Sequence, residues 1–193
     1  AKGFKAKDQK GKLSLRASDT SELVFDGVQL PADAILPKSG GLKSPLMCLT
    51  QARYGIAWGG IGAAMACYDE ALSYSKARIM FGKPIGQTQL QQSRLADMLT
   101  ELTKAQLLTL QPGRRKDAGA MTPSHVSLAK RNNINMACEA AREARRLLGA
   151  NGILAEYHSM RHMANLESVY TYEGTHDMHT LILGQAVTGL PAF

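Results

Sequence analysis

Apolar residues recur with helical spacing over most of the chain after residue 42. The segment 44–79 is rich in Ala, Gly and aromatic residues and predicts one long helix whose small side chains permit close packing. A second helix is expected over 95–117, where leucines fall near one face of a 3.6-residue period. A third is expected over 122–149, because Thr122 suits an N-cap and Pro123 suits the first helical position.

The inward faces of the second and third helices follow from the same periodicity. Two shorter helices are expected at 157–168 and 178–187. Pro112 lacks a backbone N–H, so a break or bend is expected near Gln111. The core positions expected in the two long helices are Leu95, Met98, Leu99, Leu102 and Leu110, then Val126, Ala129, Ala137, Ala140, Ala141, Ala144 and Leu148.

The first forty residues have a different texture. Partly alternating runs at 12–16 and 22–26, the second continued by 28–30 as far as Pro31, predict two strands joined by a turn. A two-stranded sheet is marginal in water, so its partner strands are expected outside this sequence or on another chain. The whole pattern predicts a mainly α fold, an up-and-down helical bundle preceded by a fragment of sheet.

Composition narrows the class of protein. The 193 residues are 45% hydrophobic and 20% charged, which suits a globular chain with a real core rather than a disordered one. Cys48, Cys67 and Cys138 are far apart without a CxxC pair, so reduced thiols of an intracellular protein, packed in the core, are expected. The longest weakly polar stretch, 55–68, is shorter than the roughly 18 residues of a membrane span.

Charge leaves two kinds of partner open. The formal charge of +7 can attract a nucleic-acid backbone or a small polyanion such as a nucleotide cofactor. Aromatic residues make up only 6%, and zinc-finger, RGG and helix-turn-helix signatures are absent from the sequence, which disfavours nucleic acid. The sequence opens without an initiator Met and without a signal peptide, and is expected to be part of a longer protein.

One segment concentrates reactive side chains. Tyr170-Thr-Tyr-Glu-Gly-Thr-His-Asp177 places two carboxylates, a hydroxyl and an imidazole in an expected loop between apolar helices. A carboxylate beside tyrosines and an apolar ligand suits proton abstraction. The alternative is a helix entry, with Thr175 or Asp177 as N-cap and Glu173 merely solvated, and residue types alone favour it.

Other clusters give weaker signals. His158 and His162 lie four apart, the spacing of a helical metal pair, but Ser159 stands where an HExxH motif has Glu, so no metal is expected. The segment 149–152 suits a helix end with a turn and is weak evidence for a phosphate cradle. Judged by residue type alone, a solvated helix face is expected at Arg142, Arg145 and Arg146.

The order of four motifs carries a family resemblance. Arg78-Ile-Met-Phe-Gly-Lys-Pro84, then Gln89 with Leu95-Ala-Asp-Met98, then Leu147-Leu-Gly-Ala-Asn-Gly152, then Tyr172-Glu-Gly-Thr175 together resemble the C-terminal half of an acyl-CoA dehydrogenase, over essentially the whole chain. The segments 15–18, 52–59 and 172–177 most resemble the members that act on glutaryl-CoA.

The resemblance implies a fold and an activity. It assigns residues 1–41 to the end of a middle β domain and residues 42–193 to the C-terminal helical bundle. By similarity, Glu173 is the general base that removes the α-proton of the acyl thioester, and the β-hydride passes to FAD. Its N–H and a flavin hydroxyl would bind the thioester oxygen as an oxyanion hole does. The glutaryl type also releases CO2 and forms crotonyl-CoA, but the arginine for the distal carboxylate lies outside this sequence.

The resemblance also implies ligand contacts. Ala150 departs from the family, which usually has a second Gly there, and Arg78 and Gln89 would reach the FAD of a neighbouring subunit. The residues implied for FAD are Arg78, Phe81, Gln89, Arg146, Leu147, Leu148, Gly149, Ala150 and Thr175. Those implied for acyl-CoA are Leu46, Arg53, Tyr172 and Gly174.

Partners and location follow from the same resemblance. Electron-transfer flavoprotein is the implied electron acceptor, and a homotetramer built as a dimer of dimers is the implied assembly. The location would be the cytoplasm of a bacterium or the mitochondrial matrix of a eukaryote, and this fragment alone is expected to be inactive. Two alternatives stay open: a non-decarboxylating dehydrogenase for a short or branched acyl-CoA, and a basic helical interaction module.

Overall fold

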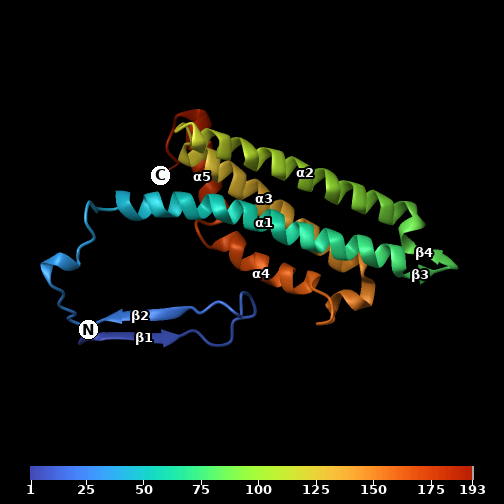
Figure 1. Cartoon of the computed structure of the whole chain (residues 1–193), viewed down its shortest axis with the longest axis horizontal. Helices are drawn as coiled ribbons and strands as arrows, with labels where there is room; N and C mark the ends of the chain where they lie inside the picture. The colour runs from blue at the N-terminus through green and yellow to red at the C-terminus, as the bar shows by residue number, and fades with distance from the viewer. Residues whose placement is uncertain (193) are drawn as a thin grey trace.

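A β-hairpin is followed by a bundle of helices in the computed structural model, which describes residues 1–192 (Figure 1). The hairpin strands are β1 (Phe4–Asp8) and β2 (Ser21–Phe25), and the helices are α1 (Lys43–Ala77), α2 (Gln89–Asp117), α3 (Pro123–Leu147), α4 (Ser159–Thr171) and α5 (His176–Thr188). Two-residue strands β3 (Ile79–Met80) and β4 (Lys83–Pro84) join α1 to α2, and short 3-10 helices lie at Ala32–Ala34, Ile85–Gln87 and Gly149–Ile153. The mainly helical fold predicted from the sequence is confirmed.

Close packing of α1 on α3 forms the centre of the bundle. The buried face of α1 carries small residues at helical spacing, and a Cβ built on Gly60 would lie only 2.6 Å from Cδ1 of Ile134. The buried Asn133 of α3 donates to the carbonyl of Ala57 at 3.1 Å and also to the hydroxyl of Thr109 on α2. This amide therefore links three helices inside the core, where a polar group must have partners.

The predicted helix faces are confirmed in α3 and partly wrong in α2. Thr122 caps α3 with Pro123 at its first turn, and every predicted inward residue of this helix is buried. On α2, three of the five predicted positions are buried, whereas Leu99 and Leu110 are 49% and 42% exposed. A helix that packs on only one side has a narrow buried stripe, so its flanking leucines remain at the surface.

Of the break or bend expected near Gln111, the break is wrong, because α2 continues through Pro112 to Asp117, and the bend stays a prediction. Pro112 is buried and Tyr54 of α1 lies against the same turn, with its hydroxyl 3.2 Å from the carbonyl of Thr109. Since a proline deprives the preceding turn of one hydrogen bond, a donor from a neighbouring helix supports the carbonyls there. Tertiary contact thus overrides the local signal.

The first strand predicted from the sequence is also wrong. Residues 12–16 form a loop in which Leu15 has φ +47°, and the strand that pairs with β2 is β1, with Phe4 opposite Phe25. The loop bonds to α4 instead: the Leu15 N–H donates to the Asn165 side chain at 2.7 Å. The second strand ends at Phe25, so the predicted extension through 28–30 is wrong as well.

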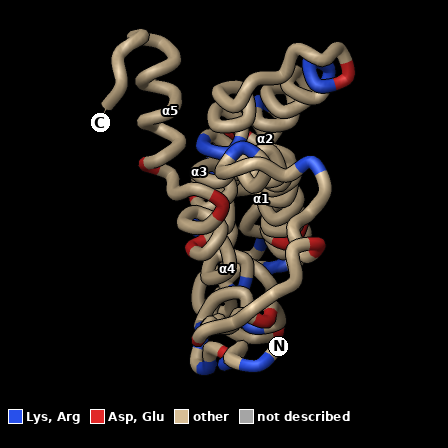
Figure 2. Tube along the Cα trace, turned by 90° about the vertical axis from the view of Figure 1, so that its left-hand side faces the viewer, with Lys and Arg blue, Asp and Glu red and all other residues tan. Residues whose placement is uncertain are grey.

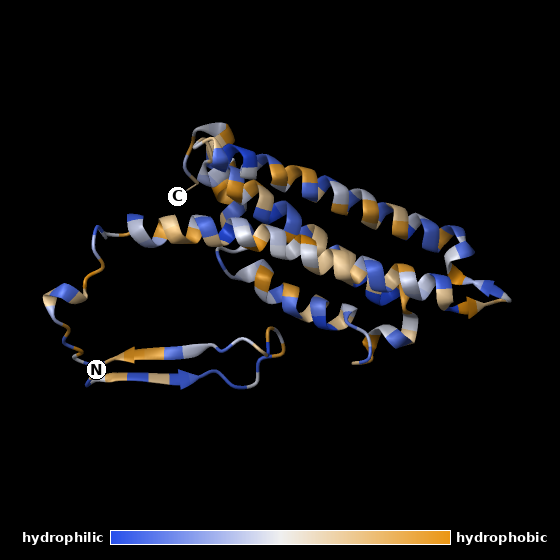
Figure 3. Ribbon diagram, viewed as in Figure 1, coloured by the Kyte–Doolittle hydropathy of each residue, from blue (hydrophilic) through white to orange (hydrophobic). Residues whose placement is uncertain are grey.

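Part of β2 is hydrophobic, as the orange colour of the ribbon shows in Figure 3. Leu23, Val24 and Phe25 are 54%, 43% and 66% exposed. A hairpin of this kind has too little buried area to be stable alone. The assignment of residues 1–41 to a β domain stays a prediction.

The cysteines lie apart from one another, and the charged residues are spread over the whole described chain. Cys67 and Cys138 are buried as predicted, while Cys48 is exposed, contrary to the core position expected for it. Figure 2 shows Lys and Arg scattered over the hairpin and the bundle among Asp and Glu. Among the helices of residues 1–192, none is both long and apolar enough to cross a membrane.

A carboxylate from α1 fixes the start of α4. Glu70 accepts hydrogen bonds from the backbone N–H groups of His158 and Ser159 at 2.7 and 2.8 Å, and from the Ser159 hydroxyl. Burial works against the charge of Glu70, but these donors hold the pKa of its carboxyl below its usual range. The orphan N–H groups of α4 are thus satisfied by another helix, which sets where α4 delivers the loop at its other end.

Candidate active site

The loop between α4 and α5 adopts an unusual backbone. Glu173 and Gly174 both have left-handed conformations, with φ of +55° and +84°. A non-glycine residue rarely adopts positive φ unless its surroundings impose it, and such residues cluster at functional sites. Thr175 then caps α5, because its hydroxyl accepts from the Met178 N–H at 3.2 Å. The helix entry predicted as an alternative is therefore present together with the strained carboxylate.

Three consecutive carbonyls of this loop are bound by side chains from other elements. Lys130 of α3 donates to the carbonyl of Tyr172 and, at 2.6 Å, to that of Gly174. Arg53 of α1 donates to the carbonyl of Glu173 at 2.8 Å. We call residues 172–174 with these donors the carbonyl clamp. It explains how the strained conformation persists.

His179 of α5 completes the clamp. Its Nε2 lies 3.3 Å from the Glu173 carbonyl and its Nδ1 lies 3.0 Å from the Ser127 hydroxyl. A carbonyl only accepts, so Nε2 carries the proton and Nδ1 accepts from Ser127. Burial lowers the pKa of His179 to about 4, with Lys130 and Arg53 adding to the effect. The imidazole is accordingly neutral at pH 7.

One oxygen of the Glu173 carboxylate has no hydrogen-bond partner in the described chain. Its Oε2 is fully buried, and no side chain or backbone group among residues 1–192 bonds to it. Buried polar atoms in native proteins are almost always paired, so an unpaired one calls for an explanation, and a catalytic role is one of those known. Arg53, Tyr172 and Gly174, three of the four residues implied for acyl-CoA, lie in or on the clamp. Leu46 lies two turns earlier on α1 and is half exposed.

Lys130 is the functional candidate that sequence reasoning missed. It is only 2% exposed, and burial lowers the pKa of its ammonium to about 8, reinforced by Arg53 and opposed by Glu173. The helical periodicity of the sequence could have identified Lys130 as buried. It lies on one stripe of α3 with Val126, Asn133 and Ile134, all of them buried. A lysine on the buried face of a helix indicates a buried partner.

A second group of predicted residues gathers at the opposite end of the bundle. A cavity of about 330 Å³ is lined by Arg78, Arg146 and the turn at Gly149, whose φ is +62°. Its other predicted walls are Leu147, Leu148 and Ala150. The structure therefore brings together six of the residues implied for FAD.

The remaining predicted residues lie around that end or elsewhere. Phe81 is 95% exposed at the tip of the β3–β4 hairpin with φ +52°, and Gln89 is exposed at the first turn of α2, where neither lines the cavity. Thr175 belongs to the carbonyl-clamp end. Arg53 and Arg78 are 25 residues apart along α1, about 37 Å at 1.5 Å per residue. One small ligand does not reach both groups within a single chain.

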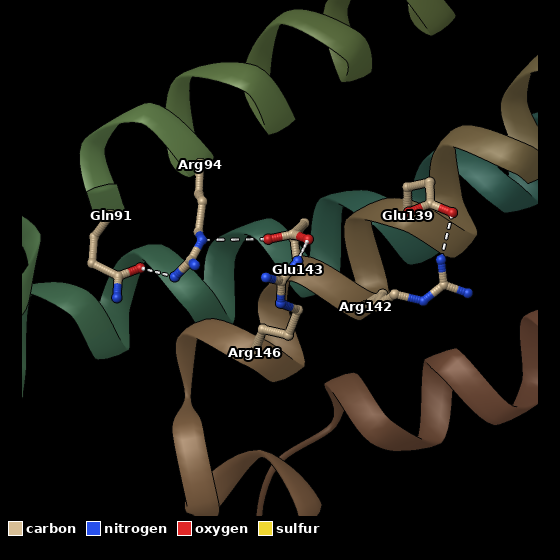
Figure 4. A network of polar contacts seen from close by, with 6 residues as sticks. All are labelled: Gln91, Arg94, Glu139, Arg142, Glu143 and Arg146. Atoms are coloured by element: carbon tan, nitrogen blue, oxygen red, sulfur yellow. Dashed lines mark hydrogen bonds and ion pairs between the residues drawn. The ribbon is translucent and has the colours of Figure 1, made fainter. Parts of the chain in front are cut away.

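An ion-pair network supports Arg146 (Figure 4). Glu143 pairs with Arg146 on the same helix and with Nε of Arg94 on α2 at 3.5 Å. Arg142 pairs separately with Glu139 at 2.6 Å. Because Arg146 remains half exposed and has five N–H donors, the pair orients its guanidinium and leaves donors for a ligand.

Metal ligands do not gather in the part of the chain that the structure describes. Within residues 1–192, no three His, Cys, Asp or Glu side chains lie close enough to hold an ion. His158 precedes the first turn of α4, and the His176 ring stacks on Tyr170 with centroids 4.5 Å apart.

Fold and site together define a helical bundle with two separate groups of candidate residues, the carbonyl clamp with its unpaired Glu173 carboxylate oxygen and an arginine-lined cavity. Residues 39–188 match the family model of the acyl-CoA dehydrogenase C-terminal domain. The chain belongs to the acyl-CoA dehydrogenase family.

Similar proteins extend the comparison. The chain is 56% identical to the crystal structure of a glutaryl-CoA dehydrogenase from Mycobacterium smegmatis, with a TM-score of 0.97, over all of this chain and 50% of that one. A second structure, of a Mycobacterium smegmatis glutaryl-CoA dehydrogenase in complex with FADH2, is 50% identical with the same TM-score and coverage. A short-chain specific acyl-CoA dehydrogenase of Megasphaera elsdenii is 33% identical over 96% of this chain and 49% of its own length. The chain thus spans about half the length of these relatives.

Proposed function

We propose that this chain is the C-terminal half of an FAD-dependent acyl-CoA dehydrogenase that oxidises and decarboxylates glutaryl-CoA to crotonyl-CoA and CO2. The observation that carries the proposal is the buried, unpaired carboxylate oxygen of Glu173 on a loop held in left-handed conformation. The 56% identity to a glutaryl-CoA dehydrogenase supports the substrate.

The base acts at the α-carbon of the acyl thioester. Glu173 would accept the α-proton, and its N–H would stabilise the charge that develops on the thioester oxygen, with bound FAD supplying a further donor. The cations of the carbonyl clamp, Arg53 and Lys130, bond to the loop carbonyls and hold the backbone of Glu173 in place. Tyr172 and Gly174 would border the acyl chain, with Leu46 farther along α1.

The cavity at the other end of the bundle fits a phosphate-bearing cofactor. Arg78 and Arg146 line it beside the open backbone of Gly149, and paired guanidinium N–H groups match phosphate oxygens. FADH2 is bound in the similar Mycobacterium smegmatis structure. Bound FAD would supply a hydride acceptor, which this chain's own side chains lack. Phe81 and Gln89, which do not line the cavity, would contact FAD from the same end, and Thr175 would contact FAD beside the base.

The separation of the two groups supports an assembly of several copies. Because about 37 Å divides Arg53 from Arg78 along α1, the arginine-lined cavity would serve the FAD of a neighbouring subunit. We propose a homotetramer, with electron-transfer flavoprotein as electron acceptor and the bacterial cytoplasm or the mitochondrial matrix as location.

Substrate choice tests the proposal directly. The purified full-length protein should carry a flavin absorbance band and should convert glutaryl-CoA to crotonyl-CoA with one CO2 per turnover, measured by product chromatography and trapping of labelled CO2. Butyryl-CoA, which lacks the distal carboxylate, serves as the matched substrate. Oxidation of butyryl-CoA far faster than glutaryl-CoA would support instead the short-chain activity named for the Megasphaera elsdenii relative. A protein without flavin that binds DNA in a salt-sensitive way would be an interaction module.

Arg78 tests the cofactor end. Replacing Arg78 with Gln should weaken FAD binding about 10- to 100-fold, since a charge-assisted hydrogen bond contributes about 1.5–3 kcal/mol. Flavin content after dialysis and fluorescence titration with added FAD would measure the change. Arg142→Gln is the control, because Arg142 pairs with Glu139 outside the cavity. Equal affinity in the two variants would remove Arg78 from the cofactor site.

A further inference from the structure

Lys130 is a buried cation whose partners are backbone carbonyls. It is 2% exposed, and no carboxylate among residues 1–192 forms an ion pair with it. Instead its ammonium bonds to the carbonyls of Tyr172 and Gly174, with the Tyr172 ring 5.8 Å from its Nζ. Burying a charge is costly unless it is well bonded, so a position like this one calls for a function.

Peptide geometry links this lysine to a donor on the other side of the loop. No peptide bond of the described chain is cis, so the Tyr172 carbonyl and the Glu173 N–H lie in one plane and point in opposite directions. By holding that carbonyl toward α3, Lys130 directs the Glu173 N–H away from α3. No acceptor within residues 1–192 bonds to this N–H. It is free to bind an oxygen of a ligand.

The positive charge of Lys130 also affects how strongly the Glu173 N–H donates. A cation bonded to a carbonyl draws electron density through the peptide group and makes its N–H a stronger donor, as in hydrogen-bond chains. Arg53 and His179 hold the next carbonyl, that of Glu173, so the following peptide plane is fixed as well. The two planes on either side of the Glu173 Cα are thus set by side chains from three helices.

We propose that Lys130 is a positioning residue that directs and polarises the Glu173 N–H toward the thioester oxygen of the acyl-CoA. This inference rests on the proposed function. In the step it supports, the α C–H bond breaks and its proton passes to the carboxylate of Glu173. The electron pair forms the enolate double bond, and the negative charge collects on the thioester oxygen, which accepts the hydrogen bond from the Glu173 N–H.

The test isolates proton removal from hydride transfer. The probe is an acyl-CoA in which sulfur replaces the β-carbon, so the bound molecule loses its α-proton but has no β-hydride to give. Its enolate is titrated by absorbance in the full-length, FAD-loaded protein. Lys130→Met removes both donor and charge, and Lys130→Gln keeps a neutral donor. Arg131→Met is the control, because this neighbouring cation bonds to Thr180 instead of the loop.

The expected results form a graded series. Lys130→Met should move the half-point of enolate formation up by about one pH unit or more, a tenfold loss, and should slow flavin reduction by true substrate about 10- to 100-fold, with KM changed less than about threefold. Lys130→Gln should fall between Lys130→Met and the unaltered protein, and Arg131→Met should match the unaltered protein. Flavin content and thermal unfolding identify a variant that fails to fold, in which case Lys130→Gln carries the test.

Two failures are distinguishable. If the unaltered protein forms no enolate and reduces no flavin, the proposed function is wrong. If it does both, and folded Lys130→Gln and Lys130→Met titrate and turn over as it does, only the role of Lys130 is overturned.

Discussion

Glu173→Gln in the full-length, FAD-loaded protein should lower the rate of flavin reduction by acyl-CoA about 10³- to 10⁴-fold. The amide has the shape of the carboxylate but does not accept the α-proton, and general-base catalysis contributes up to about 10⁴-fold. The contacts that hold the loop use the backbone carbonyls of residues 172–174, so the substitution leaves the carbonyl clamp intact. The loss should therefore be chemical rather than structural.

Stopped-flow absorbance of the flavin band under single turnover measures this rate, and the spectrum before mixing reports whether FAD is still bound. Glu167→Gln is the matched control, because Glu167 is an exposed carboxylate of α4 one turn before the loop. Reduction of Glu173→Gln at an undiminished rate would exclude Glu173 as the base. The buried oxygen at Oε2 would then need another explanation.

Gly174→Val should lower turnover about 100-fold and destabilise the protein by roughly 2–4 kcal/mol. A β-branched residue is strongly disfavoured at φ +84°. A Cβ at this position would lie 3.1 Å from Nε2 of His179, so this side chain must move, and 3.4 Å from Nη2 of Arg53. Since His179 helps to hold the Glu173 carbonyl, the base moves with it, and a displacement of about 1 Å is enough for a 10²-fold loss.

Thermal unfolding and steady-state kinetics measure the two effects of Gly174→Val separately. Gly184→Ala supplies the control, because no heavy atom lies within 4 Å of a Cβ built at Gly184, in the interior of α5. Alanine is the better helix former, so this variant should gain up to about 1 kcal/mol with unchanged turnover. Full activity in Gly174→Val would show that the clamp tolerates a side chain at this position.

The sequence predicted individual residues of the candidate site but not the contacts between them. Glu173, Arg53 and Gly174 were expected from a motif, and the structure places all three in one clamp. Neither Lys130 nor His179 belonged to that expectation. Their roles depend on contacts across 42 and 6 positions of sequence, while Arg53 reaches across 120. No local pattern encodes which carbonyl a distant donor will find.

Local physics accounts for what the sequence determined by itself. Some features involve neighbours only three or four positions apart, so they can be recognised in the sequence. These are the helix caps at Thr122 and Thr175, the apolar stripe of α3 and the small-residue face of α1. The alternating leucines at 12–16 led to the wrong prediction of a strand, because alternation alone does not distinguish a strand from a loop bonded to α4.

Tertiary structure decided the rest. It carried α2 past Pro112, paired β1 with β2, divided the implied ligand contacts between two ends of the bundle, and turned three carbonyls toward buried donors. Apart from the hairpin pairing, these outcomes depend on contacts between elements far apart in the chain. The direction of a backbone N–H, and with it the chemistry proposed for Glu173, therefore depends on how α1, α3 and α5 converge on one loop.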